Sequence, residues 1–299
     1  MSKKALVIDG NSLIYRAFYA TGNQLAYYKQ HNLPPVNALK LVMQIVLKLI
    51  SQTQYDYVLM ALDHEKKTLR HEVFEHYKAG RKPMPTDLFL QLTLIKEAMH
   101  IMGISTLSLP GIEADDIIGS FAKLMNDHDV DVEIYSSDKD LLQLVNDRTI
   151  VNLFKTGISD IHKININNFS EFFFGLLPSQ VCDFKGISGD SSDNLLGVKG
   201  VGPKTAVELI KKYGSLEGIY QSIDKLNVSQ QIKFNESKAV AIMCKQLSTI
   251  QMNVLSNYRI DDFVKKPINH EKFKFLINQY HFTGFEKYQL HKQTDIFSK

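Results

Sequence analysis

The sequence predicts an α/β protein, in which a mostly parallel sheet flanked by helices is followed by a helical region. Two patterns support this class. Short apolar runs typical of strands alternate with helical segments through the first two-thirds of the chain, and near residue 176 the strand pattern ends and helical segments follow. The alternation favours parallel pairing, because each helix carries the chain back to the end of the sheet where the preceding strand began.

The elements of the first region can be placed in order. Five strands are expected at residues 5–9, 57–63, 104–109, 130–137 and 149–154. Helices are expected at residues 37–51, 87–102, 114–127 and 139–146. The later region includes an amphipathic helix that follows a glycine-rich turn and ends near Tyr213.

Composition and length fit an ordinary soluble globular protein. With 299 residues and 44% hydrophobic content, the chain can bury a large core in one or two domains. Cys182 and Cys244 have the spacing of neither a metal knuckle nor a disulfide framework, which favours a reducing compartment. Asp9 ends the N-terminal apolar run too early for a signal peptide, and lysine and glutamine interrupt the longest apolar stretch, residues 39–50. We expect a cytoplasmic protein that does not bind membranes.

Nine carboxylates are the most informative feature of the chain. They lie at predicted strand ends, in the first turn of a predicted helix and in two acidic turns: Asp9, Asp63, Glu113, Asp115, Asp116, Asp138, Asp140, Asp190 and Asp193. Because ligands of parallel sheets bind outside the carboxyl ends of the strands, we expect Asp9, Asp63 and Asp138 to share one edge. Gathered carboxylates repel one another unless hard divalent cations such as Mg²⁺ or Mn²⁺ offset the repulsion. The set therefore predicts a metal-dependent phosphodiesterase.

Each acidic group also has a simpler explanation. Acids in the first turn of a helix complement its dipole, Asp138 could cap a helix, and residues 189–194 could form an ordinary polar turn. Without a metal site, all three explanations would have to hold at once, and the acids at two strand ends would need a further one. So many independent explanations are improbable together, which favours the metal site.

Basic residues gather in two segments, although the net charge is only +3. The first is residues 64–83 and the second is residues 197–214, and both would meet the phosphates of a polyanionic substrate. In the second segment the sequence GVKGVGPKTA precedes a helix, and its glycines permit a tight turn, with positive φ, whose free amides can bind a phosphate. Solvated helix faces explain the lysines almost as well, and the spacing is not that of a P-loop.

Six motifs, in order, resemble the 5′-nuclease (flap endonuclease) family, and are most similar to the 5′–3′ exonuclease domain of bacterial DNA polymerase I and its free-standing relatives. They are DGN at 9–11, FEHYKAGR at 74–81, EADD at 113–116, SDKD at 137–140, GDSSDN at 189–194 and GVKGVGPKTA at 197–206. The resemblance implies a PIN-like α/β domain over residues 1–175, with a helical arch at about 64–102. It also implies a helical DNA-binding region over residues 176–299, with a helix-three-turn-helix at about 184–214.

The resemblance implies a monomeric nuclease that removes 5′ flaps and 5′ ends of DNA, in primer removal and repair, with two Mg²⁺ ions that Mn²⁺ can replace. It assigns one ion to Asp9, Asp63, Glu113 and Asp115. It assigns the second to Asp138, Asp140, Asp190 and Asp193, with Asp116 in a supporting role among these metal acids.

The same resemblance assigns contacts to the substrate. Lys78 and Arg81 would stabilise the transition state, and the nucleic-acid contacts would be Tyr15, Arg16, Tyr77, Lys199, Gly200, Gly202 and Lys204, with Tyr15 stacking on an unpaired base. Some members bind K⁺ in the helix-three-turn-helix. Here Gly197 stands where they have a serine, so a K⁺ site would rest on backbone carbonyls near Val198 and Val201.

Three other functions are weighed against this one. A catalytically weak, structure-specific DNA-binding relative would be expected to have lost some of the acids, and all of them are present. A PIN-type ribonuclease fits the α/β half but leaves the basic segment and GVKGVGPKTA without a role. An aspartyl phosphatase needs a second acid two residues after Asp9, where this chain has Asn11.

Overall fold

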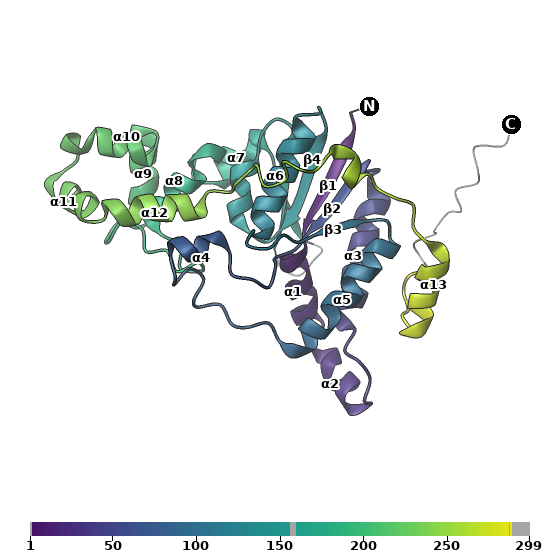
Figure 1. Ribbon diagram of the computed structural model, residues 1–299. Coiled ribbons are helices and arrows are strands. Elements are labelled where there is room, and N and C mark those ends of the chain that lie inside the picture. The colour runs from purple at the N-terminus through teal and green to yellow at the C-terminus, as the bar shows by residue number, and fades with distance from the viewer. Residues whose placement is uncertain (1, 156–159, 287, 289–299) are drawn as a thin grey trace.

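Figure 1 shows the computed structural model, which describes residues 2–155, 160–286 and 288. Within these residues a six-stranded sheet has the order β3-β2-β1-β4-β5-β6. The strands are β1 (Lys4–Asp9), β2 (Tyr57–Ala61), β3 (Ser105–Leu107), β4 (Asp131–Ser136), β5 (Thr149–Phe154) and β6 (Ile161–Ile164). The first five pair in parallel and β6 pairs antiparallel with β5, so the predicted mostly parallel sheet is confirmed and a short edge strand is added to it.

Helices cover both faces of the sheet. The burial of β1 shows this, since its alternate side chains lie in two different hydrophobic clusters. Ala5 and Val7 belong to the hydrophobic cluster that includes α6 (Ala114–Asn126), whereas Leu6 and Ile8 belong to the cluster of the other face. That second cluster includes α1 (Gly10–Ala20), α3 (Asn37–Gln52) and α5 (Thr86–Ile101). The shorter elements of this region are α2 (Asn23–Gln30), α4 (Leu69–Val73), η1 (Lys139–Leu144) and α7 (Ile166–Phe172).

A group of helices extends to one side of the sheet (Figure 1). Its members are η2 (Pro178–Gln180), α8 (Val181–Ser188), α9 (Pro203–Tyr213), α10 (Leu216–Gln221), η3 (Ile223–Lys225), α11 (Val228–Glu236) and α12 (Lys238–Ser248). Helices α8 and α9, with the long turn between them, occupy the place of the expected helix-three-turn-helix. Pro203 begins α9, where its missing N–H costs no hydrogen bond.

After α12 the described chain returns to the sheet, so residues beyond about 250 pack on the α/β part. The Lys265 N–H donates to the Asp56 carbonyl at 2.8 Å, and η4 (Ile260–Phe263) and α13 (His270–Gln279) follow the same path. Phe273 and Leu276 of α13 are buried in the cluster that contains α5. This apolar face of α13 needs a partner surface, and α5 supplies it.

The connection between β2 and α5 differs from the expected helical arch at residues 64–102. Helix α5 packs in the core through buried residues such as Leu88 and Ile95, so it covers the sheet. The connection itself is residues 64–85, in which α4 is the one helix. Gly80, Pro83 and Pro85 oppose a continuous helix there. No helix of the described residues is both long enough and apolar enough to cross a bilayer.

Candidate active site

A cleft of about 880 Å³ opens at the carboxyl edge of the sheet. Six of the nine predicted acids line it: Asp9, Asp63, Asp115, Asp138, Asp140 and Asp190. Asp9 ends β1, while Asp63 and Asp138 each follow the last residue of β2 and β4 by two positions. Parallel pairing of β1 with both neighbours therefore brings three acids, distant in sequence, to one site.

Asp9 is held in place by two neighbouring elements. Its carboxylate accepts the Ser12 N–H at 2.9 Å, which caps α1, and the Ser136 hydroxyl of β4 at 2.5 Å. The side chain is 5% exposed. Burial, with a smaller contribution from the charges of Asp138 and Asp63, raises the pKa of Asp9 to about 7 in spite of these hydrogen bonds.

Asp115 and Asp63 belong to the same group of carboxylates. Burial, followed by the charges of Asp138 and Asp9, raises the pKa of Asp115 well above its ordinary value. Asp63 accepts the N–H of Ala114, the first residue of α6, at 2.8 Å, and Asn11 accepts the Asp63 N–H at 2.9 Å. The raised pKa values show that ionising all of these carboxylates together is unfavourable, because they are buried and repel one another. A divalent cation would offset this repulsion, so the set of oxygen donors fits such an ion.

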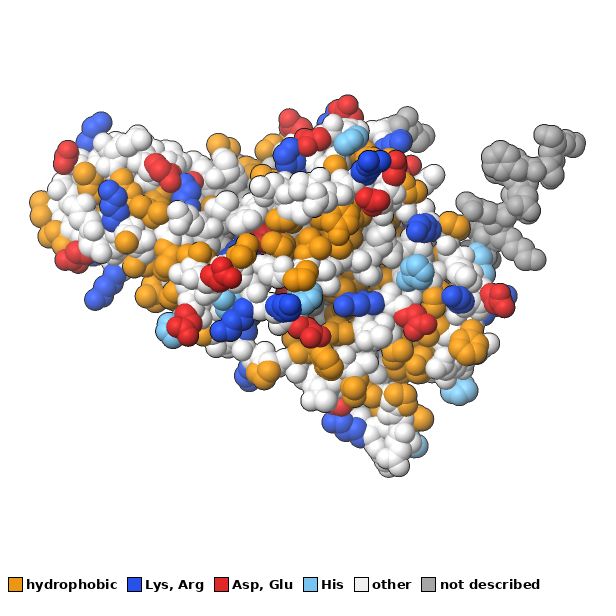
Figure 2. All heavy atoms as spheres, in the orientation of Figure 1, with side chains coloured by type: hydrophobic (Ala, Val, Ile, Leu, Met, Phe, Trp, Pro, Cys, Tyr) orange, Lys and Arg blue, Asp and Glu red, His pale blue; other side chains and the backbone are white. Residues whose placement is uncertain are grey.

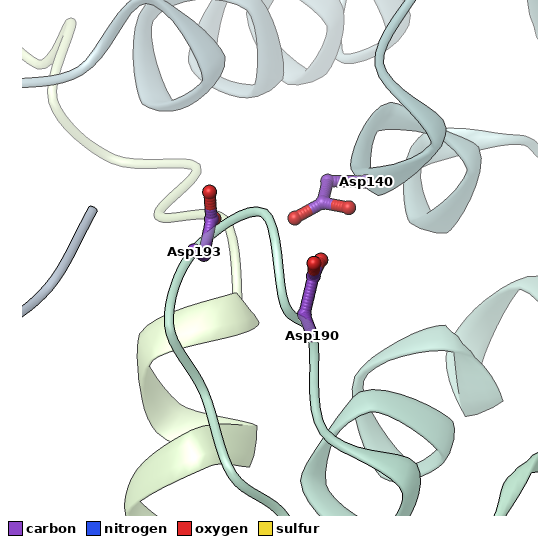
Figure 3. Close-up of side chains that lie close together, drawn as sticks. All are labelled: Asp140, Asp190 and Asp193. Carbon is purple, nitrogen blue, oxygen red and sulfur yellow. The ribbon is translucent and has the colours of Figure 1, made fainter. Parts of the chain in front are cut away.

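A second acidic group lies beside the first. Asp140, Asp190 and Asp193 each offer a carboxylate oxygen, and these oxygens lie within 4.8 Å of one another. Figure 3 shows Asp190 and Asp193 on one loop with Asp140 across from them. An all-oxygen set of this kind suits Mg²⁺ or Mn²⁺.

Two of the simpler explanations for these acids also hold. Asp138 accepts the Asp140 N–H at 2.8 Å and so caps η1. Asp190 accepts the Ser192 N–H at 2.8 Å, which is turn chemistry. Each carboxylate has further lone pairs, so the local role and a metal role are compatible.

Two cations of the chain contact the second group. Lys185 of α8 forms ion pairs with both Asp140 and Asp190, and Arg81 donates to Asp193 at 2.8 Å. Burial opposes ionisation of Asp190, but the Lys185 and Ser192 hydrogen bonds outweigh it and lower the pKa of Asp190 to about 2. No motif of the sequence identified Lys185. Its role depends on how α8 packs beside η1, which is a tertiary contact.

Lys78 and Glu113 form the other charged wall. The Lys78 ammonium lies 2.9 Å from Glu113 and lines the cleft, whereas Glu113 is buried behind it. The backbone of Lys78 is left-handed, with φ 56°, and its N–H donates to the Asp193 carbonyl at 3.1 Å. A non-glycine residue in this conformation is strained, and the contacts on both sides hold it there.

Tyr77 is placed differently from its predicted role as a nucleic-acid contact. It is 3% exposed, and its hydroxyl lies 3.3 Å from Glu113 and 3.2 Å from Asp193. Burial leaves its ring almost no surface for nucleic acid. Tyr77 instead joins the two acids that hold Lys78 and Arg81.

Asp116 points away from the cleft. The Arg70 guanidinium of α4 binds it with two hydrogen bonds, of 2.6 and 2.7 Å, and both side chains are buried. Arg70 also donates to the Leu247 carbonyl at 2.8 Å and lies 3.3 Å from Glu113. This geometry agrees with a supporting role for Asp116, and it adds Arg70, which sequence reasoning missed.

The predicted nucleic-acid contacts fall in two places. Tyr15 is half-buried and lines the cleft. Arg16 donates to the Ser137 hydroxyl at 2.9 Å and to the Lys155 carbonyl at 2.7 Å, so it ties α1 to the ends of β4 and β5. The remaining four are exposed around the start of α9: Lys199, Gly200 and Gly202 lie in the turn before the helix, and Lys204 lies in its first turn.

Only one of the two predicted contact glycines in that turn has the expected positive φ. Gly200 has φ 74°, which favours glycine, whereas Gly202 is extended, with φ −91° and ψ 178°. A Cβ at Gly202 would meet no atom within 4 Å. The fold therefore requires glycine at position 200, and it leaves room for a side chain at position 202.

Figure 2 shows Lys and Arg side chains along the connection from α4 to α5, with acidic side chains among them. Three cations of this connection, Lys78, Arg81 and Lys82, line the cleft. The first predicted basic segment therefore borders the acids directly.

Comparison with known proteins agrees with this geometry. Residues 4–173 match the family model of the 5′-3′ exonuclease N-terminal resolvase-like domain, and residues 176–271 match that of its C-terminal SAM fold. A 5′-3′ exonuclease of Mycoplasma pneumoniae is 40% identical over 278 residues, which cover 93% of this chain and 96% of the relative. DNA polymerase I of Bacillus subtilis is 37% identical over 271 residues, which cover 90% of this chain but 30% of that protein.

A solved structure shares the fold. The bacteriophage T5 flap endonuclease, in a pseudo-enzyme–product complex with DNA and metal ions, superposes with a TM-score of 0.66 at 19% identity. The match covers 94% of this chain and 100% of that one. That likeness concerns the fold, whereas the two family models and the relative of similar length show that the chain belongs to the 5′–3′ exonuclease family.

Proposed function

We propose that this chain is a monomeric, cytoplasmic, structure-specific nuclease that hydrolyses phosphodiester bonds at 5′ flaps and 5′ ends of DNA, in primer removal and repair. It uses two Mg²⁺ ions per site, and Mn²⁺ can replace them. One observation carries the proposal: carboxylates at the end of β1, just beyond β2 and β4, in α6 and in the 189–194 loop converge on one cleft that Lys78 and Arg81 also line. The T5 relative was solved with DNA and metal ions, which supports the same ligands here.

The two acidic groups would each hold one ion. Asp9, Asp63 and Asp115 face the cleft and would hold the first, while Glu113, whose oxygens contact Thr68 and Lys78, acts through Lys78. Asp138, Asp140, Asp190 and Asp193 would hold the second. When bound, the ions neutralise the acids, lower the pKa of the attacking water and stabilise the leaving oxygen.

The chain's own cations act on the scissile phosphate. Lys78 and Arg81 border the same cleft as the acids, and each is anchored by a carboxylate, Glu113 and Asp193. Fixed positive charges that need no reorganisation stabilise the charge that develops on the phosphate in the transition state. The products are a 5′-phosphate and a 3′-hydroxyl.

Substrate selection would come from two segments. The connection of residues 64–85 lines the cleft with Lys78, Arg81 and Lys82 and would admit one unpaired strand. The turn before α9 and the first turn of that helix would grip the downstream duplex, with free amides and Lys204 on its phosphates. A PIN-type ribonuclease would have no use for this turn.

A K⁺ ion is part of the same proposal, at carbonyls near Val198 and Val201. The Val198 carbonyl already accepts the Val201 N–H at 3.0 Å, which closes the turn that would hold the ion. Duplex affinity should then be higher in KCl than in NaCl at equal ionic strength. Equal affinity in the two salts would exclude the site.

The function is tested with four labelled substrates in Mg²⁺: a 5′ flap, the matched 3′ flap, a nicked duplex and a single-stranded RNA. The 5′ flap should be cut fastest, near its junction, and the nicked duplex should lose nucleotides from its 5′ end. The shortened duplex should carry a 5′-phosphate that a ligase can seal. Equal cleavage of the 3′ flap would exclude 5′ specificity, and preferred cleavage of the RNA would favour the ribonuclease.

A further inference from the structure

We propose that Tyr19 and Tyr15 form one aromatic strip that stacks on successive unpaired bases of the 5′ strand, with Tyr19 holding the base farther from the scissile bond. This inference rests on the proposed function and adds a contact to it. It concerns a residue that no sequence motif identified.

The two rings lie on the same face of α1. They are four residues apart, their centroids are 6.4 Å apart and their planes are inclined by 29°. Both rings line the 880 Å³ cleft that contains the carboxylates. Since α1 begins directly after Asp9, Tyr19 lies one helical turn farther from that acid than Tyr15 does.

Tyr19 has no evident role in the core. Its side chain is 66% exposed, whereas Tyr15 is packed against the hydrophobic cluster of α1 and α3. The Tyr19 ring packs edge-to-face with Phe18, at 5.5 Å between centroids and with planes at 76°, which favours one orientation of the ring. An exposed ring held in this way presents a flat surface at low entropic cost.

The same cleft carries the matching charge. Lys78, Arg81 and Lys82 line it together with the two tyrosines. An unpaired strand has phosphates along one side and bases along the other, and proteins that hold such strands combine a basic wall with aromatic platforms. Phosphates on Arg81 and Lys82 would therefore direct the bases toward Tyr15 and Tyr19.

A matched control is available on the neighbouring helix. Tyr27 of α2 is 57% exposed, close to the value for Tyr19, but it does not line the cleft and its ring packs on His31 at 4.2 Å. A general loss of aromatic surface would affect both tyrosines alike. Stacking on the substrate would involve Tyr19 alone.

The test measures affinity by fluorescence anisotropy, with Ca²⁺ in place of Mg²⁺ to slow cleavage. The full chain binds a nicked duplex and 5′ flaps of one, three and six nucleotides. Tyr19→Ala should weaken binding of the three- and six-nucleotide flaps about tenfold, since stacking on one base contributes roughly this much. Binding of the nicked duplex should not change, Tyr19→Phe should behave as the unmodified chain, and Tyr27→Ala should have no effect.

An abasic flap locates the contact. Removing the base that Tyr19 holds should weaken binding by the unmodified chain and make Tyr19→Ala harmless, and a 2-aminopurine at that position should be quenched by the unmodified chain only. Equal loss on nicked and flapped DNA, or no loss on either, would overturn the inference. A chain that cleaves 5′ flaps normally but is indifferent to Tyr19→Ala would leave the proposed function intact, whereas a chain that cuts no flap would refute that function by itself.

Discussion

At the end of β1, Asp9 is buried with its pKa raised to about 7, and this has a consequence for stability. Without metal, the folded carboxyl keeps its proton at pH values where the unfolded one has lost it. The free energy of unfolding should therefore fall as pH rises from about 4 to about 7. Asp9→Asn should remove the part of this fall that Asp9 contributes, so in chelator at pH 8 the variant should melt at a higher temperature than the unmodified chain.

Thermal melts in chelator from pH 5 to pH 8 check this expectation. Glu171→Gln, at an exposed position far along the chain, is the control and should follow the unmodified chain. Added Mg²⁺ should stabilise the unmodified chain more at pH 8 than at pH 5, since the cation binds the ionised acids. An Asp9→Asn variant that is less stable at pH 8 in chelator would contradict the assigned protonation.

Lys78 separates chemistry from binding. If its ammonium supports the transition state, Lys78→Ala should lower the single-turnover rate by about 10² to 10³ while DNA affinity changes little. Lys204→Ala should do the opposite, because Lys204 is exposed in the first turn of α9, outside the lining of the cleft. Single-turnover cleavage at saturating enzyme makes the comparison. An unchanged rate for Lys78→Ala would remove Lys78 from the catalytic residues.

Arg70 should contribute to the stability of the fold, because it binds the buried Asp116 carboxylate. Arg70→Met would leave the Asp116 carboxylate buried with one remaining donor, the Gln251 N–H at 2.9 Å. The free energy of unfolding should fall by about 3–5 kcal/mol. Adding Asp116→Asn should restore part of it, because a neutral amide has no unpaired charge to bury.

Chemical denaturation measures these losses. Lys245→Met is the matched control, because Lys245 also pairs with two acids but is more exposed and far from the cleft. Lys245→Met should lower the free energy of unfolding by less than Arg70→Met does. Equal stability of Arg70→Met and the unmodified chain would show that this buried pair contributes nothing to folding.

Among the elements, the turn between α8 and α9 gives the sharpest contrast. Gly200→Ala should lower stability, because φ 74° disfavours a side chain, whereas Gly202→Ala should fold normally in its open, extended conformation. If the amides near Gly202 approach a phosphate, Gly202→Ala should still weaken duplex binding. Thermal melts and anisotropy on a long duplex separate the two effects, and a Gly202→Ala variant with full duplex affinity would argue against the contact.

The salt dependence of binding tests the same turn. If Lys204 neutralises one phosphate, Lys204→Ala should reduce the slope of log K against log salt by about 1 and weaken binding equally across sequences. Affinity for a bare single strand should barely change. Equal loss on the single strand would mean that this turn does not hold the duplex.

The sequence predicts the elements that carry the acids better than the contacts between them. Strand β5 and helix α6 lie where their apolar periods place them, and parallel pairing then brings Asp9, Asp63 and Asp138 together. Strand β6 was missed because it is short and polar. The packing of α13 on α5 was missed because an apolar helix face does not reveal its partner.

Contacts between distant residues could not be derived in the same way. Lys185 meets Asp140 across 45 positions, and Tyr77 meets Asp193 across 116. Neither residue differs locally from an ordinary surface lysine or core tyrosine. Their roles follow from how α8 and the 64–85 connection pack at the sheet edge, which depends on the whole fold.

For the whole molecule, the central claim is that the acids at this edge hold the divalent cations needed to cleave a 5′ flap. The most direct measurement is single-turnover cleavage of a 5′-flap substrate, first in excess chelator and then with Mg²⁺, Mn²⁺ or Ca²⁺ added back. We predict no cleavage in chelator, recovery with Mg²⁺ or Mn²⁺, little turnover with Ca²⁺, and almost no recovery for Asp63→Ala, which should still bind the duplex. Full activity in excess chelator, or full activity of Asp63→Ala, would contradict the account.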